Sequence, residues 1–158
     1  MFWTACRLLF VSGGAWFTIG VVLLSAGMKF VLAALEGNAS RWLHQLMQIA
    51  GGREEGALLL IVLGLLVGFI KGRFVMVRAV QRMVKKLEQL SDPIPFSKAY
   101  GVRDLFLIGG MIGLGIGLRF VPLDVRGFID VAVGAALMNG AMCYFRSGLA
   151  LQKKRLPK

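Results

Sequence analysis

The sequence predicts an all-α, polytopic membrane protein, a bundle of four transmembrane helices. Hydrophobic residues fill 57% of its 158 positions and are gathered in blocks that hold almost no charge. Inside the blocks, apolar and polar residues mostly do not alternate with the period of a strand or of a half-buried helix. This is typical of helices surrounded by lipid. The nineteen lysines and arginines lie beside the blocks, so they indicate anionic lipid headgroups and topology, and not nucleic acid.

The first transmembrane helix is expected at about residues 8–29. The run from Leu8 to Met28 holds no charge and is long enough to cross ~30 Å of hydrocarbon. A signal peptide is the competing interpretation, because Arg7 precedes the apolar run. We favour a retained helix, because the run exceeds the apolar core of a signal peptide and no clear cleavage site follows it.

Residues 40–50 predict a short amphipathic helix lying on the outer membrane surface. Its apolar side follows the i, i+3, i+4, i+7 pattern: Leu43, Leu46, Met47 and Ala50. Either Asn38 or Ser40 is expected to cap its beginning. The single histidine, His44, lies on the polar side, where we expect it to be solvated and not a metal ligand.

The second transmembrane helix is expected at about 55–73, followed by a basic cytoplasmic helix over 73–90. An apolar stripe runs along the latter: Met76, Val80, Met83, Leu87 and Leu90. Its basic residues form another face, which predicts an anionic-lipid surface: Arg78, Arg82, Lys85 and Lys86. This helix is expected either to bend onto the membrane surface or to pack on a partner helix.

The third and fourth transmembrane helices are expected at about 103–121 and 127–146, followed by a basic tail over 147–158. The charge-free runs of helices two to four are shorter than ~20 residues, so each alone is also compatible with a buried core helix. Basic residues at their ends can extend them, because long cationic side chains reach back to the headgroups. One domain therefore covers residues 1–158.

Lysine and arginine are distributed unequally between the two sides of this bundle. The side with both termini and the central segment carries fourteen of them, and the opposite side carries five. Cytoplasmic loops are enriched in these residues. We therefore expect both termini in the cytoplasm, most simply at a bacterial inner membrane.

Two pairs of similar segments point to two tandem helical hairpins. Residues 27–31 resemble 117–121, and residues 69–71 resemble 144–146. A duplication would give parallel repeats about an axis normal to the membrane. The alternative is that membrane helices independently end in an aromatic residue and a base.

Small residues recur every four positions in three of the expected helices. The stripes are Gly64, Gly68 and Gly72; Gly109, Gly113 and Gly117; and Ala132, Ala136 and Gly140. Small residues let helix backbones approach closely in lipid, where van der Waals contact drives association. The stripes predict either packing inside one bundle or a face for self-association or a membrane-protein partner.

Few polar side chains lie inside the expected spans. Asn139 is the deepest of them and is expected to bridge helices or, alternatively, to line a path for a solute. The hydroxyls of Ser12, Thr18 and Ser25 can bond to their own helix backbone. At the outer ends, we expect Asp130 to pair with Arg126, and Asp124 with Arg119. Cys6 and Cys143 are expected near the same membrane face as free thiols.

The residues form no catalytic, metal-binding or nucleotide-binding motif, so we expect no enzyme and no cofactor. The glycine stripes and the basic amphipathic segment favour a protein that acts through helix packing, as a scaffold, assembly factor or accessory subunit of a membrane complex. The alternative is a small channel or transporter with Asn139 on the path.

Overall fold

The computed structural model describes residues 2–3, 5–37, 40–89, 94–95, 109–110 and 113–155. Its helices are α1 (Ala5–Glu36), α2 (Arg41–Ala50), α3 (Arg53–Gln89) and α6 (Leu123–Arg155), with a 3-10 turn, η1 (Leu118–Phe120). Two two-residue strands, β1 (Phe2–Trp3) and β2 (Ile94–Pro95), pair antiparallel with Phe2 opposite Pro95. The fold is therefore all-α apart from this short pairing.

Within the part of the chain that the structure describes, three helices are long and apolar enough to cross a membrane. The apolar spans cover Cys6–Glu36 in α1, Arg53–Phe74 in α3 and Leu123–Lys153 in α6. Large apolar side chains remain outside the packed interior, among them Val22, Leu58 and Phe74, which are 61%, 62% and 66% exposed. Water would make such surfaces unfavourable over three helices, whereas lipid does not. The chain is an integral membrane protein by these criteria.

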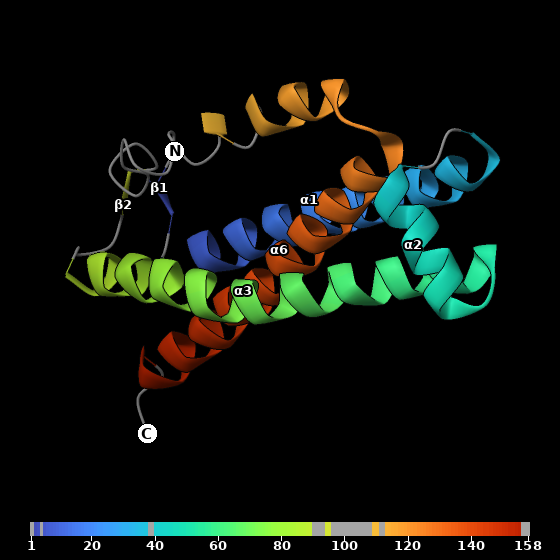
Figure 1. Ribbon diagram of the computed structural model, residues 1–158. Helices are drawn as coiled ribbons and strands as arrows, with labels where there is room; N and C mark the ends of the chain where they lie inside the picture. Colours follow the sequence, from blue (N-terminus) through green and yellow to red (C-terminus); the bar gives the residue numbers. More distant parts are fainter. Residues whose placement is uncertain are drawn as a thin grey trace.

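Helix α6 is the centre of the molecule, and α1 and α3 both pack along it (Figure 1). Two clusters of buried residues mark the ends of this arrangement. The termini-end cluster consists of Leu8, Leu9, Val80, Tyr144 and Leu151. The α2-end cluster consists of Val31, Ala34, Leu43, Ala57, Leu60, Ile61 and Val131. Each cluster contains residues from α1, α3 and α6.

The order of residues in the clusters gives the direction of each helix. Helix α1 starts at the termini-end cluster, whereas α3 and α6 both start at the α2-end cluster. Accordingly α1 is antiparallel to the other two, and α3 and α6 are parallel. Figure 1 shows both termini toward the end of the molecule opposite α2.

The helices extend beyond the expected membrane spans. Helix α1 continues past Lys29 to Glu36, and α6 continues past Arg146 through most of the expected tail. Both basic side chains are exposed, so neither interrupts its helix. The expected second span and basic helix form one uninterrupted 37-residue helix, α3. Charge limits how far the hydrocarbon can extend along a helix, but it does not end the backbone hydrogen bonding.

Helix α2 lies against the beginning of α3 and covers nearly the range expected for it. Gly51 reverses the chain between them with φ of 90°, a conformation that glycine adopts without strain. A Cβ atom on Gly56 would lie 2.9 Å from Cα of Met47, so the two backbones are in close contact. Leu43 enters the α2-end cluster and Leu46 packs against it, whereas His44, Gln45 and Gln48 are exposed. Helix α2 is thus amphipathic.

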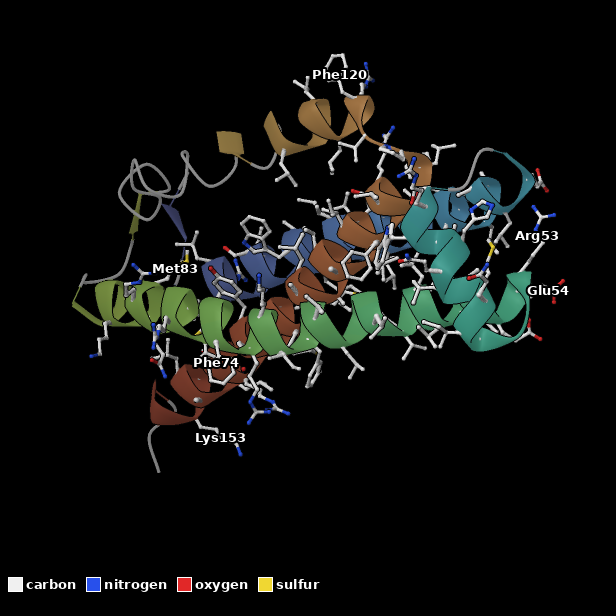
Figure 2. The ribbon with its side chains drawn as sticks, in the orientation of Figure 1. Arg53, Glu54, Phe74, Met83, Phe120 and Lys153 are labelled. Atoms are coloured by element: carbon white, nitrogen blue, oxygen red, sulfur yellow. The ribbon has the colours of Figure 1, made fainter. Side chains whose placement is uncertain are left out.

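The first pair of segments behind the expected duplication differs in structure. Gly27 and its counterpart Gly117 are both helical, whereas Phe30 lies within α1 and its counterpart Phe120 lies within the 3-10 turn η1. The guanidinium of Arg126 lies over the ring of Phe30. Phe120, in contrast, is 89% exposed, and Figure 2 labels it on the outside of the molecule. Pro122 follows two residues after Phe120 and cannot continue a helix hydrogen-bonding pattern. Residues 103–108 and 111–112 of the expected third span lie outside the described residues.

Candidate functional site

The glycine stripe of α3 packs directly on the small residues of α6. A Cβ atom on Gly68 would overlap the carbonyl oxygen of Ala132, and one on Gly72 would lie 2.7 Å from Cα of Ala136. On Gly64 it would lie 3.0 Å from Val131. Two of the three expected stripes therefore face each other, and Gly140 is buried one turn further along α6. Close approach of this kind is how small residues stabilise helix pairs in lipid.

A second glycine interface, between α1 and α6, is not apparent from spacing by four. A Cβ atom on Gly20 would lie 2.9 Å from the carbonyl oxygen of Gly134, and one on Gly27 would lie 2.8 Å from that of Gly127. The reverse distances, from Gly127 and Gly134 to α1, are both 2.8 Å. Backbone therefore meets backbone on both sides of this interface.

Spacing by seven is the signal that predicts the α1–α6 interface. In α1 the glycines are Gly13, Gly20 and Gly27; in α6 the small residues are Gly127, Gly134, Ala141 and Gly148. A repeat of seven returns to the same side of a helix every two turns, so both series form continuous seams. Because the helices are antiparallel, the step from Gly20 to Gly27 along α1 meets the step from Gly134 back to Gly127 along α6, whereas a Cβ atom on Gly13 would meet the side chains of Tyr144 and Phe145.

Polar groups inside the spans are bonded to helix backbone. Ser12 donates to the carbonyl of Leu8 at 2.8 Å, Thr18 donates to that of Gly14 at 3.0 Å, and Ser25 donates to that of Val21. This confirms the expectation for these three hydroxyls. The amide Nδ2 of Asn139 donates to the carbonyl of Phe69 at 3.2 Å, which links α6 to α3. The hydrogen bond lies beside the α3 glycine stripe.

The remaining expected stripe packs on none of the described residues. Cβ atoms placed on Gly109, Gly113 and Gly117 would have nothing within 4 Å. All three glycines are exposed, as are Leu114 and Ile116 between them. We call this face the open stripe. It differs in this respect from the stripes of α3 and α6.

At the α2 end, Asp124 is fully buried and accepts a hydrogen bond from the hydroxyl of Ser40. Ser40 occupies the N-cap position of α2 without a capping hydrogen bond from its side chain, and the other expected cap, Asn38, lies outside the described residues. The expected pair of Asp124 with Arg119 is wrong, because Arg119 is exposed while this carboxylate turns toward α2. His44 lies nearby, with Nδ1 3.2 Å from the carbonyl oxygen of Ser40.

Arg126 joins α6 to α1 at the same end. Its guanidinium carbon lies 4.2 Å from the ring centroid of Phe30, and its Nε lies 3.9 Å from a carboxylate oxygen of Asp130. The second contact is the i,i+4 pair expected from the sequence. Arg53 adds a hydrogen bond from α3 to the carbonyl of Leu35 in α1. These polar contacts connect the helices where they leave the apolar interior.

The basic segment of α3 does not turn its apolar stripe toward the membrane surface. Val80 is buried in the termini-end cluster, and Met83 and Val84 pack against that cluster (Figure 2). Its basic side chains face outward: Arg78, Arg82 and Lys85 are exposed, while the side chain of Lys86 lies outside the described part. Two of the five stripe residues, Val80 and Met83, thus pack within the chain, whereas the side chains of Met76, Leu87 and Leu90 lie outside the described part.

Both cysteines pack against the termini-end cluster as free thiols, as expected. Among the described residues, no three histidine, cysteine, aspartate or glutamate side chains come together as they would to hold a metal ion. The described part of the chain thus offers helix interfaces as its best-defined functional feature. No family model, curated protein or solved structure matches this chain.

Proposed function

We propose that the chain crosses the membrane four times, with both termini in the cytoplasm of a bacterium. The directions of α3 and α6 support this. Since α3 ends and α6 begins at opposite ends of the molecule, the connection between Gln89 and Leu123 joins these two ends. The apolar run at 105–118 lies in that connection and supplies the fourth crossing.

We further propose that the protein acts through helix packing, as a non-enzymatic scaffold, assembly factor or accessory subunit of an inner-membrane complex. The open stripe is the observation that carries this proposal. The glycine stripe of α3 and the glycines at Gly20, Gly27, Gly127 and Gly134 are used in contacts within the chain, whereas Gly109, Gly113 and Gly117 meet none of the described residues. A glycine-rich face that contacts none of the described residues is suited to a helix of a second chain.

The bonding of the intramembrane polar groups supports packing over transport. Asn139, the residue expected on a solute path, bonds to the Phe69 carbonyl, and the three hydroxyls of α1 bond to their own helix. A path for ions or polar solutes needs polar groups that replace the solvation of the solute. These side chains instead already form hydrogen bonds with backbone carbonyl groups.

Native mass spectrometry of the full chain in mild detergent tests the proposal. We expect a defined oligomer or a co-purifying membrane protein. Gly113→Leu is expected to abolish that complex while the thermal stability of the chain is retained. The matched variant Gly68→Leu should instead destabilise the chain itself, because its side chain meets Ala132.

A strict monomer with no co-purifying protein would contradict the packing role. So would a complex that survives both substitutions. Solute flux into liposomes that is lost on Asn139→Leu would favour the channel interpretation in its place.

A further inference from the structure

One side of α3 is apolar within the membrane and basic immediately beyond it. The apolar ridge consists of Leu63, Val67, Ile70 and Phe74, all of them exposed. The basic depression, of about 470 Å³, is lined by Arg78, Gln81, Arg82 and Lys85. Measured from Phe74, the ridge lies at steps of −4, −7 and −11 residues, and Arg78, Gln81 and Lys85 lie at steps of +4, +7 and +11. Such steps fall within about 40° of one direction on an α-helix, so ridge and depression share a face.

The depression begins one helical turn beyond Phe74, the last residue of the ridge. Among the described residues, an apolar span of α3 covers the 22 residues Arg53–Phe74. At 1.5 Å per residue this is about 33 Å, close to the hydrocarbon thickness of a bilayer. Arg78 lies about 6 Å beyond Phe74 along the axis and Lys85 about 16 Å, from where a lysine chain can reach back. Phosphates of the adjacent leaflet lie at this level.

The depression is held in a fixed orientation. Val80, Met83 and Val84, on the other side of α3, pack in or against the termini-end cluster, which prevents the helix from rotating. Arg82 Nε donates to the carbonyl of Arg78 at 3.1 Å, which orients one guanidinium and leaves its other donors for a ligand.

Among the side chains that the structure describes, the charge around the depression favours an anion; the side chain of Glu88, three residues after Lys85 in α3, lies outside the described part. All acidic side chains that the structure describes lie toward the other end of the molecule: Glu36, Glu54, Glu55, Asp124 and Asp130. Arg146 and Lys153 of α6 are exposed at the same end as the depression. Guanidinium and ammonium groups bind phosphate oxygens well.

From this juxtaposition we propose that α3 carries a binding site for one anionic phospholipid. The headgroup phosphate occupies the basic depression and an acyl chain lies along the apolar ridge. A soluble phosphate would use only the depression, and an acidic protein segment would not need an apolar ridge within the membrane. The continuity of both parts on one face therefore favours a lipid. The site depends on α3 crossing the membrane, and is independent of any partner at the open stripe.

Native mass spectrometry of the full chain, titrated with phosphatidylglycerol or phosphatidylcholine, tests this site. We expect saturable binding of phosphatidylglycerol over phosphatidylcholine. Each basic residue contributes roughly five-fold near an anionic lipid, so Arg78→Gln with Lys85→Gln should weaken binding about 30-fold. The control, Arg146→Gln with Lys153→Gln, removes the same charge at the same end of the molecule and should retain binding.

A second pair of variants separates a lipid from other anions. Ile70→Ser with Phe74→Ser leaves the charge unchanged and should weaken phosphatidylglycerol binding at least several-fold, because both side chains are exposed on the ridge. Equal loss in the α6 control, no preference for the anionic lipid, or full retention by the ridge variant would overturn the proposal. Competition by inorganic phosphate at equal concentration would also overturn it. The proposal would also be overturned if an acidic protein co-purified with the unsubstituted chain but not with the Arg78→Gln, Lys85→Gln variant, while that variant still bound the lipid.

Discussion

At the scale of single residues, the close contacts between the helices of this protein depend on the absence of a Cβ atom in glycine. At Gly68 and Gly134 the neighbour that a Cβ atom would meet is backbone, which cannot move aside as a side chain can. In lipid, helix association is driven by van der Waals contact, so the glycines at these positions determine how closely the helix backbones approach each other. At Gly14 a Cβ atom would meet nothing within 4 Å. The same substitution should therefore have opposite consequences at different glycines.

We predict that Gly68→Ala and Gly134→Ala each lower the free energy of unfolding by about 1–3 kcal/mol, because the added methyl group forces the helices apart. Gly14→Ala should leave it unchanged or raise it slightly, because alanine is the better helix former. Thermal or denaturant unfolding in detergent, followed by circular dichroism, measures all three. Equal effects at the three positions would contradict the observed interfaces.

Ser40→Ala is predicted to destabilise the α2 end. The substitution removes the hydroxyl that donates to the buried carboxylate of Asp124, and loss of a partner to a buried group costs about 1–3 kcal/mol. Limited proteolysis near Arg41 should become faster. The control is Ser25→Ala, whose hydroxyl bonds only to its own helix, and it should change neither stability nor proteolysis.

At the scale of elements, the apolar runs predicted where helices lie, but not how far they extend. Lys29 and Arg146 end the charge-free runs of α1 and α6, yet each lies inside its helix because its side chain points outward. Spacing by four predicted the small-residue faces of α3 and α6, while the seam between α1 and α6 required spacing by seven. The hydrogen bond from Ser40 to Asp124 joins positions 84 residues apart, so no local pattern could predict it.

Position 80 provides a prediction about how α3 docks. Val80 is 2% exposed in the termini-end cluster, against which Cys6 and Cys143 also pack. Val80→Ser should loosen this end and speed the reaction of both native thiols with a maleimide. Gln81→Ser, at the exposed neighbour, should leave the labelling rate unchanged. Unchanged labelling in both variants would show that the stripe of α3 is not held in the cluster.

At the scale of the whole molecule, the parallel directions of α3 and α6 are the basis for the proposed four crossings. A protein with both ends on one side of a membrane must cross an even number of times. Helices α1, α3 and α6 provide three spans, and both termini lie toward the same end of the molecule. The segment that connects α3 to α6 therefore determines whether the chain is inserted as proposed. It also carries the open stripe.

Labelling of single cysteines tests this topology most directly. With Cys6 and Cys143 replaced by serine, a cysteine is placed at Ser97, before the proposed crossing, or at Phe120, which follows it. A membrane-impermeant maleimide is applied to spheroplasts, whose cytoplasmic membrane is intact. It should label the Phe120→Cys variant at once, and the Ser97→Cys variant only after the membrane is permeabilised. Labelling of both positions from the same side would contradict four crossings.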